Sequence, residues 1–296
     1  MSKKQMNHGG VFGLVFLGAL LLLSGCASVS NPDAKMLSHA AKTGAGGAAQ
    51  VQGVKLSYRL ASERLTLREP VILSFTASNE SGQARSLDLG QDRKANFLFT
   101  VKLPDGKTIQ LPQLRREGIS VPGQVSLEPG QVYTQRLLLN EWYEFSEPGA
   151  YEITARLVTS QAANSSDAAS DSPEFRARLE IAPLDKGRLK ETCSSLLKQI
   201  TGAGSYSDAA EAALALSYVK DPVAIPFLEK ALSSGKMVEP VAISGLERID
   251  GQEAERVLAA TAEAGQDEDV KELSKAALER LKMRRGGKAK PSPSNM

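Results

Sequence analysis

The chain has 296 residues, of which 36 are lysine or arginine and 34 are aspartate or glutamate, so its formal net charge is +2. Proteins that bind nucleic acid present a strongly basic surface, and this near-balance argues against nucleic acid as a partner. The length suits about two domains. A hydrophobic content of 42% is enough to fill ordinary cores.

Residues 1–25 have the three parts of a secretory signal peptide. Lys3 and Lys4 form a basic start, and an apolar run follows from Val11 to Leu23. That run is shorter than the roughly 20 residues that a membrane-spanning helix needs. Because these lysines are the only charged residues of the segment, its removal leaves equal numbers of basic and acidic side chains. We therefore expect residues 1–25 to be cleaved.

The sequence Leu23-Ser24-Gly25-Cys26 at the end of this segment resembles the bacterial lipobox. The resemblance implies that Cys26 becomes the N-terminus after cleavage and carries fatty acyl chains such as palmitate. Two or more acyl chains anchor a protein stably to a membrane. The residue that follows Cys26 is Ala27 and not Asp. In bacteria with two membranes, the resemblance then favours the outer membrane, facing the periplasm. The alternative is a plain secretory signal with a chance cysteine.

Residues 26–50 are rich in alanine, glycine, serine and lysine and show no sustained hydrophobic period. This composition predicts a flexible tether between the anchor and the folded part of the chain.

From residue 51 to residue 183 the pattern predicts about nine short strands separated by turn signals, with no helical period between them. A series of this kind favours an antiparallel β-sandwich. The predicted strands are Val54–Leu60, Val71–Ala77, Ser86–Leu89, Asn96–Leu103, Thr108–Leu111, Gln124–Leu127, Val132–Leu139, Ala150–Val158 and Phe175–Ala182.

The segment Glu147-Pro148-Gly149-Ala150-Tyr151-Glu152-Ile153 resembles the turn-Gly-x-Tyr corner of immunoglobulin-like domains. The resemblance implies that the Tyr151 hydroxyl bonds back to the backbone at the corner. Ile153 stands where antibody domains often have cysteine, so the likeness is to bacterial Ig-like sandwiches that lack the disulfide.

After Pro183 the hydrophobic period becomes 3.6, which predicts helices from residue 184 to residue 285. The first helix is predicted over Leu184–Ile200. Ser207 and Asp208 are predicted to cap the start of the second. The turns are predicted at Lys220-Asp221-Pro222 and Asp250-Gly251. Six apolar positions of the first helical unit recur about 30 residues further along the chain, and two of these positions recur a second time. The set is Ala212, Leu216, Val219, Ala224, Phe227 and Leu228, then Ala242, Leu246, Ile249, Ala254, Val257 and Leu258, then Leu278 and Leu281.

These helix–turn–helix units resemble short HEAT repeats of the phycobilisome-lyase-type HEAT-like proteins. An unrelated small helical bundle is the alternative.

Residues 286–296 are predicted to be a disordered tail. The basic residues from Lys282 onward are expected to be solvated, with contact to an anionic envelope polymer or lipid as the other interpretation. Because the connection around Pro183 is short, we expect the two domains to touch.

Familiar catalytic and cofactor motifs are missing. After cleavage the only histidine is His39, in the tether, so neither folded domain can hold a Ser-His-Asp or Cys-His pair. Two-histidine zinc motifs, Cys-x-x-Cys and the glycine-rich nucleotide loops are also absent from the sequence. We therefore predict no cofactor and no metal. Catalysis by carboxylates alone stays open, with Asp88, Asp92, Glu141 and Glu144 as the candidate residues. Asp88 and Asp92 more simply flank a solvated turn.

Trp142 and Tyr143 are the candidate partner-binding residues, because both types are common at interfaces. They are equally the usual core and corner residues of a sandwich. Cys193 is expected to be a small buried hydrophobe, with intermolecular pairing as the alternative. The connection from Leu114 to Ile119, followed by Pro122-Gly123, is a loop that can insert into another protein's site.

The sequence therefore predicts a multidomain β + α protein, with an Ig-like β-sandwich followed by a short HEAT-like helical domain. The expected function is that of a lipid-anchored, non-enzymatic cell-envelope protein, a scaffold or interaction module that binds an unknown envelope protein. An inhibitor of an envelope protease or hydrolase, acting through a sandwich loop, is the alternative. Both expectations depend on the anchor and on recognition folds with little built-in chemistry.

Overall fold

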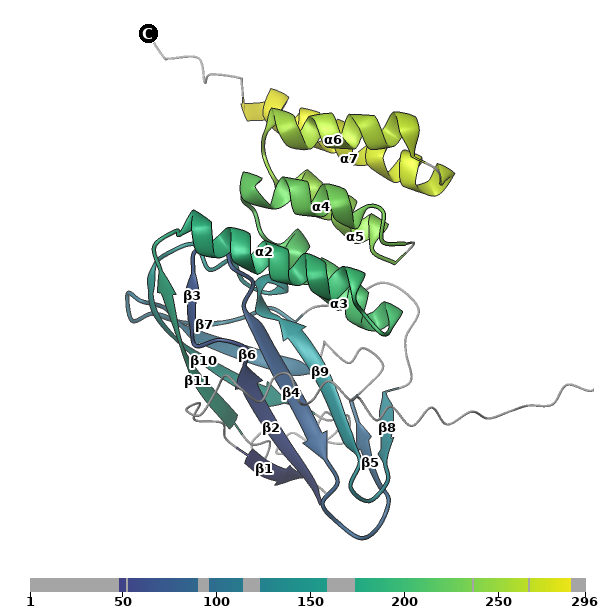
Figure 1. Ribbon diagram of the computed structural model, residues 1–296. Helices are drawn as coiled ribbons and strands as arrows, with labels where there is room; N and C mark the ends of the chain where they lie inside the picture. The colour runs from purple at the N-terminus through teal and green to yellow at the C-terminus, as the bar shows by residue number, and fades with distance from the viewer. Residues whose placement is uncertain are drawn as a thin grey trace, which may run out of the picture. The chain divides into compact units, whose positions relative to one another are not determined.

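The computed structural model describes residues 48–51, 53–89, 96–113, 123–158, 174–235, 237–265 and 267–288. Strands come first along the chain and helices follow, which confirms the predicted β + α order (Figure 1). Residues 43–296 belong to one compact unit. The predicted signal peptide, Cys26 and most of the predicted tether lie outside the described residues. None of the described helices is long and apolar enough to cross a membrane.

The strands form two larger sheets and one small one. The first sheet has the order β1-β2-β4-β9 and the second the order β3-β11-β10-β6-β7, while β5 pairs with β8. All pairs are antiparallel except β3 with β11. The bounds are β1 Ala48–Val51, β2 Val54–Leu60, β3 Arg64–Thr66, β4 Ile72–Ser78, β5 Arg85–Asp88, β6 Phe97–Lys102, β7 Thr108–Gln110, β8 Gln124–Leu127, β9 Val132–Leu138, β10 Gly149–Leu157 and β11 Glu174–Ala182.

Alternating side chains explain why both larger sheets bury one face. In β4, Leu73 and Phe75 are fully buried while their neighbours are only partly buried, and β10 alternates in the same way around Ile153. Successive side chains of a strand point to opposite faces, so this pattern turns one apolar face of each sheet inward. Residues of both sheets, Phe97 and Phe99 of β6 among them, belong to one shared hydrophobic core.

Each of the predicted strands is present with closely similar bounds. Two further strands, β1 and β3, were not predicted. β1 lies where the sequence analysis placed the end of the tether, since its Ala48–Val51 pairs with β2. β3 has only three residues, Arg64–Thr66, which is too short for an alternating pattern to be recognised.

The corner before β10 has the predicted backbone bond. The Tyr151 hydroxyl donates to the Glu147 carbonyl oxygen at 2.8 Å. Gly149 enters the strand with φ +143°, and a Cβ at this position would lie 2.7 Å from the Pro104 side chain. Only glycine fits both the backbone angle and the close approach.

The helical part has one 3-10 turn, η3, and six described α-helices. Asp185 caps α2 through the amides of Gly187 and Arg188. Ser205, and not the predicted Ser207, caps α3 through the amide of Asp208. The bounds are α2 Lys186–Thr201, α3 Tyr206–Ser217, η3 Pro222–Ala224, α4 Ile225–Ala231, α5 Glu239–Arg248, α6 Gln252–Ala264 and α7 Glu268–Lys288.

The helices stack in two rows. α2 contacts α4, which contacts α6, while α3 contacts α5, which contacts α7. All of the recurring apolar positions are buried except Phe227 and Leu278, which are partly buried. α5 approaches α3 so closely that a Cβ on Gly245 would lie 2.8 Å from the Ser217 Cα. The recurring residues therefore form one apolar core between the rows.

α7 extends past residue 285, where the sequence analysis placed the end of the helical part. Arg284 donates to the Glu247 carbonyl oxygen, and Arg285 pairs with Asp250 at 3.2 Å and with Glu255. These contacts hold the end of α7 against the α5–α6 turn. The basic residues Arg284 and Arg285 therefore stabilise the fold, while residues 289–296 lie outside the described part of the chain.

Candidate functional site

A buried carboxylate joins the sheets to the helices. Glu69 follows β3, and its side chain is only 3% exposed. Its carboxylate accepts hydrogen bonds from the Thr66 amide at 2.7 Å, from Arg188 Nε at 3.0 Å and from the Thr192 hydroxyl. A buried charge is tolerated when it is paired and hydrogen-bonded in this way. Because Arg188 and Thr192 belong to α2, Glu69 holds that helix against the end of β3.

Thr66 adds a second link at the same place. Its hydroxyl donates to the Pro183 carbonyl oxygen at 2.6 Å and accepts from the Asp185 amide at 2.7 Å. Asp185 is also the N-cap of α2. The start of α2 is therefore tied to β3 through backbone groups as well as through the Glu69 ion pair, as expected from the short connection at Pro183.

Arg68 lies in the same turn and reaches a different part of the helical region. It is the only described non-glycine residue with positive φ, at +73°. A non-glycine residue in this conformation costs about 1–3 kcal/mol and persists where its surroundings hold it. Its guanidinium pairs with Asp221, whose side chain is 3% exposed. Asp221 also caps η3 through the Val223 amide at 3.0 Å.

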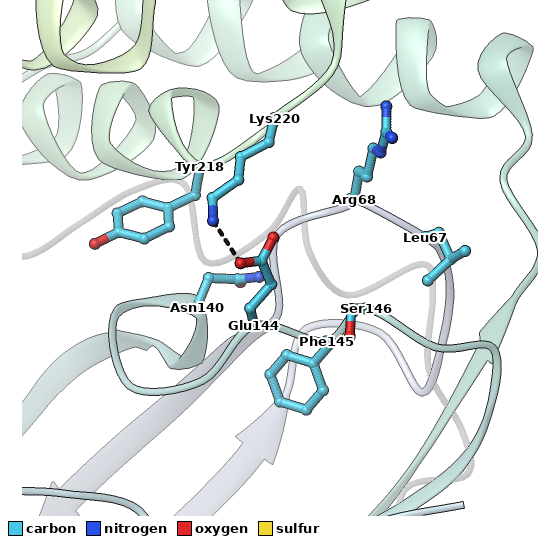
Figure 2. A pocket seen from close by; sticks show the side chains of 8 residues that line it. All are labelled: Leu67, Arg68, Asn140, Glu144, Phe145, Ser146, Tyr218 and Lys220. Carbon is cyan, nitrogen blue, oxygen red and sulfur yellow. Dashed lines mark hydrogen bonds and ion pairs between the residues drawn. The ribbon is translucent and has the colours of Figure 1, made fainter. Parts of the chain in front are cut away.

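A cavity of about 200 Å³ opens beside this turn (Figure 2). Three segments that are far apart in the sequence line it: the β3–β4 turn, the residues after β9, and the connection between α3 and η3. The lining residues are Leu67, Arg68, Asn140, Glu144, Phe145, Ser146, Tyr218 and Lys220. We call this cavity the junction pocket. Both the sheet part and the helical part of the chain contribute to its walls.

One exposed ion pair crosses the junction pocket. Lys220 Nζ lies 2.7 Å from Glu144 Oε2, and the two side chains are 38% and 64% exposed (Figure 2). Asn140 is fixed because its Oδ1 accepts from the Val71 amide at 2.6 Å. This bond occupies the carbonyl side of the Asn140 amide and leaves its NH₂ group for another acceptor. Figure 2 shows that NH₂ group on the side of Glu144.

Three further residues of the lining, Leu67, Phe145 and Tyr218, have apolar or aromatic side chains. Leu67 is partly buried and Phe145 is buried in the sheet core. The Tyr218 ring is held by Arg248, whose Cζ lies 4.3 Å from the ring centroid. Arg248 also donates to the Ser217 hydroxyl at 3.1 Å. The Tyr218 ring therefore packs against a guanidinium that is itself bound to Ser217.

The polar lining of the junction pocket consists of residues with donor groups, Arg68, Lys220 and Asn140, the hydroxyl of Ser146 and one exposed carboxylate, Glu144. Among the described residues, no group of three or more His, Cys, Asp or Glu is placed to hold a metal ion. The acidic side chain of the junction pocket, Glu144, is occupied by Lys220.

The structure places the predicted binding residues beside the junction pocket and not in it. Trp142 is only 6% exposed, and its ring centroid lies 5.0 Å from that of Phe99 in the core. Tyr143 is partly buried, and its ring packs edge-on against Phe145 at 5.1 Å. The two residues therefore support the pocket wall from behind, which agrees with the structural alternative for this aromatic segment.

Cys193 is a free, fully buried thiol in α2, as expected for a small buried hydrophobe. Burial raises its pKa to about 12, and the negative charges of Asp221 and Glu69 act in the same direction. The thiolate is the reactive form of cysteine, so this residue is inert in the folded protein.

The other candidates are not assembled into a site. Asp88 ends β5, where it pairs with Gln124, and nothing further is described of its side chain. Asp92, the connection 114–119 and Pro122 lie outside the described residues. The sequence analysis missed Arg68, Glu69 and Lys220, and it considered Glu144 only as a candidate catalytic carboxylate. The available signal was the Lys220-Asp221-Pro222 turn, which was interpreted only as a helix boundary.

No protein-family model matches the chain, and no curated protein sequence matches it. Among solved structures, a β-glucosidase from Listeria innocua is 13% identical and aligns over 43% of this chain and 16% of its own, with a TM-score of 0.24. The sporulation control protein Spo0M from Bacillus subtilis is 8% identical over 50% of this chain and 56% of its own, with a TM-score of 0.26. The CARDB domain of the PF1109 protein from Pyrococcus furiosus is 10% identical over 46% and 100%, with a TM-score of 0.23. These similarities are too low to carry an argument about function.

Proposed function

We propose that the chain is a lipid-anchored cell-envelope protein that acts as a non-catalytic scaffold or protein–protein interaction module. The lipobox-like sequence ending at Cys26 supports the anchor, with acyl chains on that cysteine. In an organism with two membranes, Ala27 favours the outer membrane, facing the periplasm. The partner is then an envelope protein that the anchored chain meets at the membrane surface.

We further propose that the strands form an Ig-like sandwich and that the helices are HEAT-like repeats. The shared core of the two larger sheets and the Tyr151–Glu147 bond support the first assignment. The two rows of helices and the burial of the recurring apolar set support the second. Both folds serve mainly as recognition surfaces in proteins.

The observation that carries the proposal is the junction pocket, whose walls come from both parts of the chain. Glu69 with Arg188, and Arg68 with Asp221, fix the two parts to each other. A surface that is already ordered loses little conformational entropy on binding. The charged and apolar groups of the junction pocket are thus preorganised for a partner.

Crosslinking in living cells, followed by mass spectrometry, tests this function. We expect the full-length protein to capture one defined envelope protein. A Lys220→Glu variant, which reverses a charge in the junction pocket, should lose that product. The matched control is Lys190→Glu on the exposed side of α2, which should keep it. Recovery of only nonspecific neighbours by the unaltered protein would refute the scaffold function.

A further inference from the structure

One end of β11 has a neighbouring strand on each side, and the other end has a neighbour on one side only. β10 pairs with residues 174–181 of β11. On the opposite side, β3 pairs with residues 180–182, and none of the other described strands pairs with β11 there (Figure 1). Residues 174–179 therefore form an open edge of the second sheet, which we call the β11 edge.

The backbone of the β11 edge has hydrogen-bonding groups that the described chain does not use. At the covered end, the Glu180 amide points towards β3 and donates to the Glu63 carbonyl oxygen at 2.8 Å. Because backbone groups alternate in direction along a strand, the N–H and C=O groups of residues 174, 176 and 178 point to the same side. No backbone hydrogen bond joins these groups to another described residue on that side. An extended segment of another protein can supply the missing partners by adding a strand to the sheet.

The outward side chains of β11 carry charges in a definite order. Glu174 and Glu180 are acidic, Arg176 and Arg178 between them are basic, and all four are exposed. β3 matches this order where it is present, because Arg64 lies opposite Glu180 and its Nε is 3.3 Å from Glu180 Oε2. Opposite charges across two strands stabilise a sheet, and like charges destabilise it. A segment that continues the line of β3 should therefore have acidic residues opposite Arg178 and Arg176, and a basic residue opposite Glu174.

The two arginines of the β11 edge are available for new contacts. Arg178 is exposed and makes no ion pair within the described part of the chain. A hollow of about 620 Å³ adjoins it, so its neighbours leave space around this side chain. Arg176 is 67% exposed and lies 3.5 Å from Glu174 and 3.9 Å from Glu152. Exposed ion pairs of this length contribute little free energy, so Arg176 can turn towards an incoming carboxylate at small cost.

The inward side chains of the β11 edge are apolar. Phe175 and Leu179 are only 4% and 1% exposed, whereas Ala177 between them is partly buried and packs against the sheet core. Alternate side chains of an added strand point to this inner side. An apolar residue of the added strand next to Ala177 would cover the part of the core that this small side chain leaves exposed.

We propose that the β11 edge binds an extended segment of a partner protein by strand addition, and that this segment has two acidic residues and one basic residue at alternate positions, with apolar residues between them. The chain's own residues 27–47 do not have this pattern, because Asp33 is their only acidic residue. The inference goes beyond the proposed function, since the β11 edge shares no residue with the junction pocket.

Calorimetric titration of the full-length lipoprotein in non-ionic detergent micelles tests it, with three synthetic peptides as probes. Acetyl-Thr-Glu-Val-Glu-Val-Lys-Thr-amide fits an antiparallel segment, and acetyl-Thr-Lys-Val-Glu-Val-Glu-Thr-amide fits a parallel one. In acetyl-Thr-Lys-Val-Glu-Val-Lys-Thr-amide, the residue opposite Arg178 is lysine in either direction. We expect one of the first two peptides to bind about 5-fold more tightly than the third. Binding of neither, or equal binding of all three, would overturn the inference.

A charge exchange makes the test independent of how well a variant folds. Arg178→Glu should reverse the preference, so that the two-lysine peptide binds about 5-fold more tightly than the peptide preferred by the unaltered protein. Misfolding cannot reverse a preference. Lys102→Glu is the matched control and should leave all three affinities unchanged. Lys102 is exposed on the same face of the sheet, opposite Glu152, but lies on β6, two strands from β11. An unreversed preference in Arg178→Glu would contradict the inference.

The hydrogen bonds of the added strand are tested separately from its charges. Every second N–H group of a paired strand points to its neighbour. N-methylation of one alternating set of amides in the preferred peptide should therefore weaken binding about 10-fold, and N-methylation of the other set should not change it. Equal effects of the two sets would show charge attraction without strand pairing and would refute the inference. A dimer of the peptide-free protein that Arg178→Glu dissociates in sedimentation would also refute it, because the β11 edge would then pair two copies of this chain.

Discussion

The Glu69 carboxylate lies 3.0 Å from Arg188 Nε, although 119 positions separate the two residues in the sequence. One belongs to the turn after β3 and the other to the first turn of α2. The preceding residue, Arg68, reaches Asp221 in the same region. A single two-residue segment thus supplies two of the ion pairs that join the helices to the strands, and in each of them the carboxylate is only 3% exposed.

Loss of the Glu69 charge should destabilise the whole protein. We expect Glu69→Gln to lower the free energy of unfolding by about 2 kcal/mol, since Arg188 and Thr192 then lose a charged partner. Urea unfolding followed by the fluorescence of Trp142, the only tryptophan, measures the change. Glu80→Gln is the control, because its pair with Lys55 is exposed and should contribute less than about 1 kcal/mol. Equal losses of unfolding free energy in Glu69→Gln and Glu80→Gln would show that the Glu69–Arg188 pair does not hold the helices to the strands.

Cys193 reports on the opening of the same junction. With its pKa raised to about 12 by burial, the thiol should not react with a disulfide reagent between pH 7 and 9. We expect labelling of Cys193 only when the protein is unfolded, and faster labelling in Glu69→Gln. Cys26→Ser protein serves for the assay, so that Cys193 is the only cysteine. Rapid labelling of the folded protein would contradict the closed junction.

The same thiol makes stability depend on alkaline pH. Its pKa rises on folding from an ordinary value of 9.0 to about 12, so the unfolded chain releases this proton first. The contribution to stability is complete below pH 9 and is lost as the pH rises from 9 towards 12, by at most about 1.4 kcal/mol per pH unit. Cys193→Ala should have a shallower loss of stability over this range than the unaltered protein. Parallel curves for the two proteins would exclude this linkage.

Two tyrosines of the strand region should respond oppositely to the loss of their hydroxyl groups. The Tyr58 hydroxyl is buried without a hydrogen-bond partner among the described residues. The Tyr151 hydroxyl donates to Glu147. We expect Tyr58→Phe to leave stability unchanged or raise it by about 1 kcal/mol, and Tyr151→Phe to lower it by about 1 kcal/mol. Thermal unfolding of the two variants side by side measures the difference, and a larger loss for Tyr58→Phe would disprove this account of the core.

Gly245 should be intolerant of alanine despite its place in a helix. Glycine to alanine usually stabilises a helix by about 1 kcal/mol. Here the added methyl group would lie 2.8 Å from the Ser217 backbone and would push α5 away from α3. We expect Gly245→Ala to destabilise by about 1–2 kcal/mol, since overpacking outweighs propensity. Ser244→Ala, at the neighbouring position of α5, is the control and should be nearly neutral. A stabilising Gly245→Ala would refute the close α3–α5 contact.

The anchor has its own test. Cys26→Ser removes the residue that we propose to be acylated, so we expect an uncleaved precursor or a protein released into the soluble fraction. Fractionation in high salt distinguishes acyl anchoring from electrostatic adsorption. A variant that stays fully in the membrane fraction after this wash would show that Cys26 does not anchor the chain.

Most of the strands and helices were predicted from the sequence, because strand alternation and helical periodicity depend only on residues that are close together in the chain. The Tyr151 bond was expected from the resemblance to the immunoglobulin-like corner, and its partner Glu147 lies only four positions away in the sequence. β3 and the cap at Ser205 were missed, because a three-residue strand has no period and several residues near 205 are suitable caps.

The junction pocket was not predictable by such patterns. Its residues come from three distant segments, and each of Arg68, Glu144 and Lys220 looks like an ordinary solvated charge in its own stretch of sequence. Arg68 also adopts a backbone conformation that arginine rarely takes, which no sequence rule anticipates. Trp142 and Tyr143, the predicted binding residues, directly precede Glu144 in the sequence. The structure places Trp142 in the core and Tyr143 packed against it.

The central claim is that the partner binds at the junction pocket, and site-specific photo-crosslinking in living cells tests it most directly. A photoreactive residue would replace Ser146 at the pocket rim, and a second protein would carry it at Glu263, exposed on α6. The account predicts a crosslink from position 146 to one envelope protein, and none to that protein from position 263. The same partner captured equally from both positions, or no partner from position 146, would contradict it.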